Sequence, residues 1–437
     1  MRVPTERNIF SQTGPRSNPY RMLLWGGLIF AGISILLGLS RGTIEPLFAP
    51  TPTSTRSANS FNLEAKANYL AGDLEAAEES YQNSLRVNPD DAQTLAELAR
   101  IQTYRSSLLT PENQREKLIQ ALENIEQAIE LDPLNSTVHA IYAFVLDWNA
   151  DAVAFSEDRN RLLSDAEEAA IRATQLDNNN PLALAYRAEV LSDQQRWIEA
   201  RDLAERAVQI QPNIMDTHRV LGTVLEATGF YGQAIEEYKK ASDIEPNFTY
   251  LYIKIGQNYR VLRLYDQALE YFDRAATINE LLGIQDPLPY IAIAKTYSRD
   301  GEFFIAAINV ESALKFDPEN PDIYGVLGII RTRARNFEDA IPVLKCAVVG
   351  CSADENDDLE IAINGLPLND SSLPYYLQLS GLLAAYGIEC SLAIALMDDI
   401  EEIYFDDSIT MSVIQENRNV WAILCSASTD SPPVHEE

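Results

Sequence analysis

The sequence has few of the residues from which catalytic and metal centres are built. It contains only three histidines, and its four cysteines form no C-x-x-C pair. A phosphate-binding loop, a dinucleotide fingerprint and the H-E-x-x-H zinc motif are also missing. We therefore predict that the chain is not an enzyme and uses no metal or other cofactor.

Positive charge is also scarce. The 437 residues include 65 Asp and Glu but only 34 Lys and Arg, which gives a formal charge of −31. Because such a balance repels phosphate backbones, nucleic acid is excluded as a general partner. The excess of carboxylates favours a well-hydrated outer surface instead.

The sequence does contain a recurring helical pattern, which is clearest at residues 229–246, GFYGQAIEEYKKASDIEP. Ala234, Tyr238 and Ala241 fall on one face of a helix. Gly229 ends the helix before it, and Pro246 cannot continue the pattern and so closes it. A helix this short is unstable alone in water, so its apolar stripe requires neighbouring helices.

Copies of the pattern occur on both sides at intervals of 34 residues. Equivalent positions are Ala200, Ala234 and Ala268, and again Ala207, Ala241 and Ala275. A helix–turn–helix period of this length resembles the tetratricopeptide repeat (TPR) family. That family has a small residue at repeat position 8, which is matched here by Gly222.

The resemblance implies an all-α fold, a right-handed superhelical solenoid of helix–turn–helix repeats. We expect eight units over residues 58–351, with longer second helices in units two and three. An irregular connection is expected at 352–373, then a degenerate ninth repeat with a capping helix at 374–425. A disordered tail is expected at 426–437.

The N-terminal region predicts a membrane anchor. Residues 22–40 are uncharged and long enough to span a bilayer, and Arg2, Arg7, Arg16 and Arg21 precede them in a short basic segment, 1–21. The positive-inside tendency then predicts a cytoplasmic N-terminus and extracytoplasmic repeats. Residues 41–57 form a Pro/Thr/Ser-rich stalk. A cleaved signal peptide is the alternative.

All four cysteines lie in the last quarter of the chain, at Cys346, Cys351, Cys390 and Cys425. An even number outside the cytoplasm favours disulfides, for which three connectivities are possible. Gly350 lets the chain turn back so that Cys351 reaches Cys346, and Cys390 then pairs with Cys425. The alternatives are a zinc site, for which the chain lacks paired C-x-x-C knuckles, and free core thiols.

The resemblance also implies that the first helix of each repeat lines a concave groove. Carried onto this chain, the groove positions have a basic and an aromatic end: Arg219, Arg260, Lys295, Arg299 and Arg333, then Tyr104 and Trp148. Asp216, Glu226 and Asp322 oppose the basic residues. The lysine–asparagine clamp of chaperone-binding relatives is absent, since Arg219 and Thr223 occupy those positions.

Two functions follow as hypotheses. The first is a membrane-anchored extracytoplasmic scaffold that binds a peptide or protein partner, such as an acidic segment, in the groove. The second is a structural protein that self-assembles through its solenoid and membrane helix. Gly27, Ala31, Ser34 and Gly38 share one face of that helix, where small residues favour close packing of membrane helices.

Overall fold

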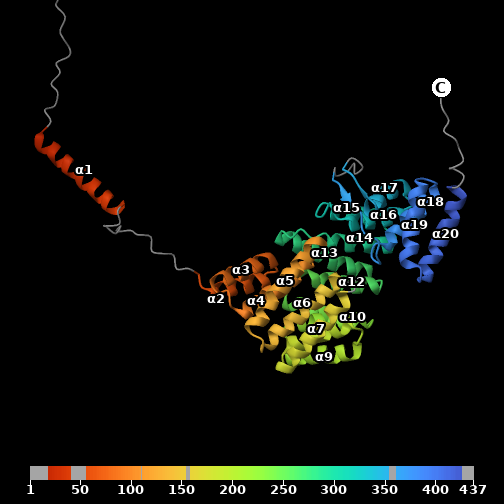
Figure 1. The fold of residues 1–437 in the computed structure, drawn as a ribbon, viewed down its shortest axis with the longest axis horizontal. Helices are drawn as coiled ribbons and strands as arrows, with labels where there is room; N and C mark the ends of the chain where they lie inside the picture. The colour runs from red at the N-terminus through yellow and green to blue at the C-terminus, as the bar shows by residue number, and fades with distance from the viewer. Residues whose placement is uncertain (1–17, 41–55, 110, 154–157, 354–360, 426–437) are drawn as a thin grey trace, which may run out of the picture. The chain divides into compact units, whose positions relative to one another are not determined.

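The computed structural model describes residues 18–40, 56–109, 111–153, 158–353 and 361–425. The chain divides into two compact units, Met1–Arg56 and Ser57–Glu437, with α1 in the first and α2–α20 in the second (Figure 1). Most of the predicted basic segment and stalk, and the whole predicted tail, lie outside the described residues.

The described part of the first unit contains one helix, α1 (Pro19–Ser40), which begins three residues before the predicted span. Its length and apolar composition are sufficient to cross a membrane. The side chains of Leu23, Trp25 and Phe30 are exposed along it. Lipid would therefore have an apolar surface to cover.

The second unit is built of helix pairs in which each helix packs against the next. The described residues contain eight such pairs before the C-terminal region: α2 (Ala58–Leu70) with α3 (Leu74–Val87), α4 (Ala92–Ser106) with α5 (Pro111–Leu131), α6 (Ser136–Ala152) with α7 (Asp158–Leu176), α8 (Pro181–Asp193) with α9 (Trp197–Ile210), α10 (Met215–Ala227) with α11 (Tyr231–Ile244), α12 (Thr249–Val261) with α13 (Tyr265–Leu282), α14 (Leu288–Asp300) with α15 (Phe303–Leu314), and α16 (Pro321–Arg333) with α17 (Phe337–Val348). The predicted all-α repeat fold is confirmed.

Packing within a pair follows the stripe read from the sequence. Ala234, Tyr238 and Ala241 on α11 have no exposed surface. A Cβ added to Gly222 on α10 would collide with the ring of Tyr238. The small residue therefore allows the aromatic side chain of the second helix to lie against the backbone of the first.

The longer second helices predicted for units two and three are present, with 21 residues in α5 and 19 in α7. The 18 residues of α13 were not predicted. Glu280 stands in α13 where Pro212 and Pro246 end the preceding two repeats, so this helix continues until Gly283, whose φ of 70° terminates it.

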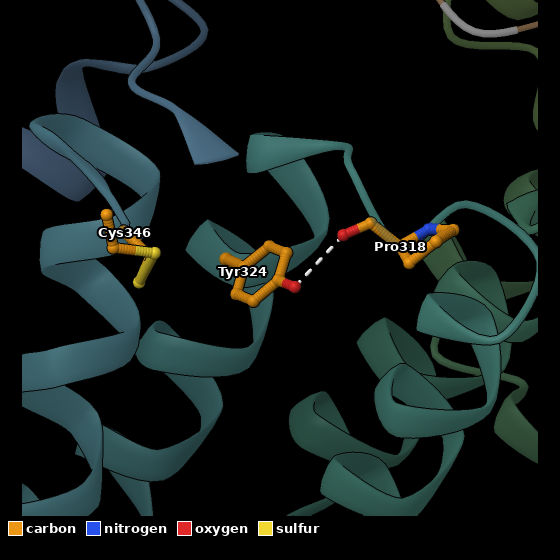
Figure 2. Close-up of a disulfide and its surroundings, with 4 residues drawn as sticks. Pro318, Tyr324 and Cys346 are labelled. Carbon is orange, nitrogen blue, oxygen red and sulfur yellow. Dashed lines mark hydrogen bonds between the residues drawn. A yellow bond between two sulfur atoms is a disulfide. The ribbon is translucent and has the colours of Figure 1, made fainter. Parts of the chain in front are cut away.

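The C-terminal region adds α18 (Leu373–Tyr386), α19 (Cys390–Tyr404) and α20 (Ser408–Leu424). The connection before them is less irregular than predicted, since β1 (Gly350–Cys351) pairs antiparallel with β2 (Ile363–Asn364). Disulfides join Cys346 to Cys351 and Cys390 to Cys425, the pairing expected from the sequence. Figure 2 shows the first of them near Tyr324, whose hydroxyl donates to the Pro318 carbonyl at 2.9 Å.

The first five repeats curve until their two ends meet. The side-chain amide of Asn247, in the turn between α11 and α12, donates to the carbonyl of Ala71, in the turn between α2 and α3, at 3.1 Å. The side chains on the inner face of these repeats consequently pack against one another across the array. One continuous hydrophobic core includes Ala65 in α2 and Ile255 in α12.

Candidate functional site

The first helices of repeats six to nine, together with α20, enclose a pocket of about 710 Å³. This volume is in the range of ligand-binding clefts. The charged and polar lining residues are Arg260 from α12, Lys295, Ser298 and Arg299 from α14, Arg333 from α16, Tyr375 and Gln378 from α18, and Glu416 and Asn417 from α20.

Four of the five basic groove residues predicted from the sequence therefore line one pocket. Lys295 and Arg299 are one turn apart on α14, and Arg333 follows Arg299 by one 34-residue period. Glu416 is the acidic residue in the lining. The pocket wall thus carries more positive than negative charge, although the chain as a whole is strongly acidic.

These four cations form no close ion pair in the part of the chain that the structure describes. Among the described residues, no ion pair involves Arg260, Lys295, Arg299 or Arg333 within 4.0 Å. Burial, together with the nearby Arg299, lowers the pKa of Arg260 to about 10. Burial also lowers the pKa of Lys295, to which Arg260 and Arg299 contribute while Asp322 opposes them. A bound anion would relieve this repulsion.

Hydrogen-bond donors in the pocket are only partly satisfied. Arg260 donates from Nη1 to the Ala292 carbonyl at 3.1 Å, but its buried Nε has no partner in the described part of the chain. Arg333 donates to the Ser298 hydroxyl at 3.1 Å. The amide nitrogen of Asn417 is likewise buried without a partner there. Such donors fit a ligand that is rich in acceptors.

The pocket lining also has an apolar part. It includes the aliphatic side chains Leu377, Leu382 and Ala385 from α18, Val413 and Val420 from α20, and Val326, Ile329 and Ile330 from α16. Gly381 on α18 lets α20 come close, since a Cβ at that position would lie 3.1 Å from the side chain of Asn417. The site therefore combines cations with aliphatic groups.

Arg219, the fifth basic residue, is not in this pocket. It has no exposed surface and forms a two-pronged ion pair with Glu189, at 2.6 Å from Nη2 to Oε2. The rings of Tyr104 and Phe144 lie within 6 Å of its guanidinium. The prediction that Arg219 contacts a partner is therefore wrong for this structure, because the array itself occupies its surroundings.

The aromatic end of the predicted groove is likewise filled by the protein. Tyr104 is fully buried and donates its hydroxyl to Asp216, which also accepts from the hydroxyl of Tyr186 at 2.6 Å. Trp148 is half-buried between Tyr104 and Tyr250. Tyr104 therefore has no surface to offer a partner, which corrects its assignment to the groove.

Asp216 is the centre of this internal network. Arg100 lies 3.1 Å from its carboxylate. Burial by itself raises the pKa of Asp216, but Arg100, Arg219 and the two tyrosine hydroxyls outweigh it and hold the pKa below its usual value. The carboxylate consequently stays charged and binds the inner faces of several repeats together.

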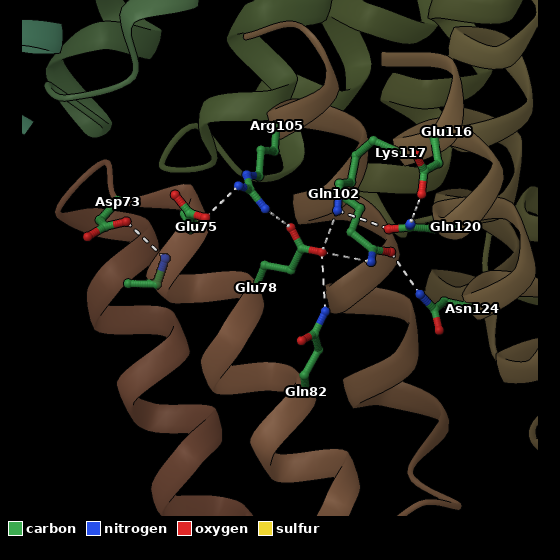
Figure 3. A network of polar contacts seen from close by, with 11 residues as sticks. Asp73, Glu75, Glu78, Gln82, Gln102, Arg105, Glu116, Lys117, Gln120 and Asn124 are labelled. Atoms are coloured by element: carbon green, nitrogen blue, oxygen red, sulfur yellow. Dashed lines mark hydrogen bonds and ion pairs between the residues drawn. The ribbon is translucent and has the colours of Figure 1, made fainter. Parts of the chain in front are cut away.

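Charges in the first two repeats are satisfied in the same way. Figure 3 shows the carboxylate of buried Glu78 receiving Arg105 at 2.7 Å and Lys117 at 2.9 Å, with Gln82 and Gln102 donating to it as well. Hydrogen bonds from these cations keep the pKa of Glu78 below its usual value although burial opposes them. This end of the array is thus held together by its own polar groups.

Two parts of the pocket were missed by the sequence analysis. The wall formed by α20 lies outside the repeat pattern, so no repeat position could indicate its orientation. Gln378 and Leu382 belong to the degenerate ninth repeat, whose register is weakly marked in the sequence. The spacing of Val413, Glu416 and Val420 on one helical face was the available signal.

Comparison with known proteins gives little information about the fold beyond what the chain itself shows. No protein-family model matches the chain, and no curated protein matches it. The crystal structure of TTC0263, a thermophilic TPR protein of Thermus thermophilus, is similar at 17% identity, 46% coverage of this chain, 98% of that chain and a TM-score of 0.38. The crystal structure of MamA is similar at 24% identity, 39% and 92% coverage and a TM-score of 0.28.

The assignment to the TPR type of fold therefore rests on the chain itself. Its 34-residue period and its consecutive helix pairs together define a helix–turn–helix solenoid. The concave surfaces of such arrays are extended and suited to holding a protein partner.

Proposed function

We propose that the protein is a membrane-anchored scaffold whose pocket in repeats six to nine binds an acidic segment of a protein partner. The observation that carries this proposal is the group formed by Arg260, Lys295, Arg299 and Arg333, which line one pocket without an ion pair among the described residues. Arginine suits carboxylates because its planar fork donates two parallel hydrogen bonds.

The acidity of the rest of the chain supports the choice of ligand. A segment with negative charge is repelled by most of a surface whose formal charge is −31. The four cations then give it one place of favourable potential, which steers encounter as well as binding. A cationic partner would instead be attracted to many places on the array.

Photocrosslinking tests this proposal in cells. A photoreactive amino acid replaces Gln378 in the pocket or, as a control, exposed Lys240 on α11. The proposal expects a discrete partner protein on the Gln378 variant that is missing from the Lys240 variant and is lost when Arg260 and Arg299 are both changed to Ala. Equal products from both positions would contradict it.

The membrane part of the proposal rests on α1 and the arginines that precede it in the sequence. We propose a cytoplasmic N-terminus with the repeats on the other side of the membrane. Protease added to cells with a permeabilised outer layer should then digest the repeats. Protection of residues 60–437 would overturn this topology.

Self-assembly is the second candidate function, supported by the small residues on one face of α1. Gly27 has open space where a Cβ would be, so a second helix could approach closely. Light scattering of the purified protein at rising concentration separates the two functions. Growth in mass without a partner would favour self-assembly, whereas a constant mass supports the scaffold.

A further inference from the structure

Few residues of the last helix, α20, are buried against the rest of the array. Only Thr410 and Ile414 are buried along its 17 residues. Its far end is joined to the start of α19 by the disulfide between Cys390 and Cys425. At the same place the Trp421 indole donates to the carbonyl of Cys390 at 2.9 Å.

The other polar attachments of α20 lie at the surface. Arg418 reaches Asp398 and Glu401 on α19, at 2.6 Å in each case, and both carboxylates are substantially exposed. Exposed ion pairs contribute little to stability because water and salt screen them. The disulfide is therefore the strongest single constraint on where α20 lies.

One face of α20 forms part of the pocket described above. Val413 and Val420 each lie three or four residues from the adjacent pair Glu416 and Asn417, so the four residues share that face and line the pocket. The cations of α12, α14 and α16 line the same pocket. A ligand bound there would meet both these cations and the valines of α20.

We propose that α20 is a disulfide-held specificity wall, which makes the pocket select segments carrying an apolar side chain beside their carboxylates. This inference rests on the proposed function, because it concerns the same pocket. The cations attract any acidic segment, whereas Val413 and Val420 distinguish those that can also cover aliphatic surface. Reduction of Cys390–Cys425 frees the end of α20 and removes this discrimination while leaving the cations in place.

Fluorescence anisotropy with the full-length protein in detergent micelles tests the inference. The probes are two labelled peptides of equal length and charge, one with leucines between its acidic residues and one with serines there. The oxidised protein should bind the leucine peptide about 10-fold more tightly, the size of preference an apolar pocket gives. Cys390→Ser with Cys425→Ser should bring the two affinities to within about 2-fold.

Three further variants keep the result interpretable if that double variant loses its helical circular dichroism signal. Val413→Ser with Val420→Ser retains the disulfide and should also abolish the preference for leucine. Ile409→Ser changes an exposed residue of the same helix that does not line the pocket and should leave the preference unchanged. Cys346→Ser with Cys351→Ser, which opens the other disulfide, should leave it unchanged as well.

The outcomes separate this inference from the function on which it rests. Equal binding of both peptides by the oxidised protein would overturn the inference and leave the acidic-segment proposal standing. A preference that survives both the cysteine and the valine changes would also overturn it. If neither peptide binds, the proposed function itself is wrong and the inference falls with it.

Discussion

In repeats one to five, Arg219 is buried against Glu189, whereas in repeats seven and eight Arg299 and Arg333 line an open pocket without an ion pair among the described residues. Both sets come from first helices, whose concave side was expected to bind a partner. The difference arises where the α2–α3 turn meets the α11–α12 turn, since the curved array then buries its own inner face. The same type of residue is structural in one part of the array and available for binding in the other.

The largest expected effect is on stability in the first five repeats. Arg219→Ala should lower the free energy of unfolding by about 3–5 kcal/mol, because it leaves the carboxylate of Glu189 buried without its partner. Arg260→Ala, the matched change in the pocket, should cause no such loss because Arg260 neutralises no carboxylate. Urea unfolding followed by circular dichroism measures both, and a neutral Arg219→Ala would remove the distinction between the two regions.

The next effect is on binding. Arg260→Ala combined with Arg299→Ala should weaken capture of an acidic partner or peptide by about 2 kcal/mol or more. Arg161→Ala with Lys240→Ala removes the same charge from exposed positions on α7 and α11 and should change affinity far less. Titration calorimetry compares the two double variants. Equal losses would show that the net charge of the chain, rather than the pocket, determines affinity.

The half-buried carboxylate of Asp193, on α8, should make stability depend on pH. Burial and the neighbouring carboxylates Asp151 and Glu189 raise the pKa of Asp193 to about 7, while Arg159 and Lys254 oppose them. A raised pKa means that the folded state holds the proton more tightly. The contribution of Asp193 to stability is therefore complete below its unfolded pKa near 4 and is lost as the pH rises through about 7.

Asp193→Asn should remove the loss of stability that accompanies the ionisation of Asp193. We expect the variant to be more stable than the wild type by about 2 kcal/mol at pH 8, with the difference disappearing or reversing at pH 5. Denaturant unfolding at the two pH values measures it. A stability difference that does not change with pH would show that the pKa of Asp193 is not raised in the folded protein.

The smallest expected effect concerns the acidic residue of the pocket. Glu416→Gln removes the negative charge that α20 contributes to the pocket lining, so an acidic ligand should bind more tightly by about 0.5 kcal/mol. The gain should appear mainly in the association rate and shrink in high salt. Stopped-flow fluorescence at two salt concentrations measures it, and a weaker affinity would mean that Glu416 contacts the ligand favourably.

The fold was predicted well from the sequence because the residues that pack together within a repeat lie close together along the chain. The alanine and glycine positions that let helices approach, such as Gly222 and Ala234, recur with a fixed period, and the buried stripe follows directly from it. The length of α13 was not predicted because its only signal in the sequence is that position 280 is Glu280 rather than the proline of the two preceding repeats. An absence is a weaker signal than a breaker that is present.

The candidate site was predicted only in part, for a different reason. Repeat position predicted that Arg260, Lys295, Arg299 and Arg333 would lie near one another, and the four residues line one pocket. It could not show that Arg219 would be buried, since that depends on contact between helices more than a hundred residues apart, such as Arg100 on α4 with Asp216 on α10. Closure of the array depends on its curvature, and the repeat pattern in the sequence does not predict that curvature.

Arginine-specific labelling of the folded protein, read out by mass spectrometry, tests the difference between the two regions most directly. The account predicts that Arg299 and Arg333 react readily and are protected when an acidic peptide is present, whereas Arg219 stays unlabelled until the protein is denatured. Reaction of Arg219 at the rate of Arg299, or labelling of Arg299 and Arg333 that the peptide does not change, would contradict it.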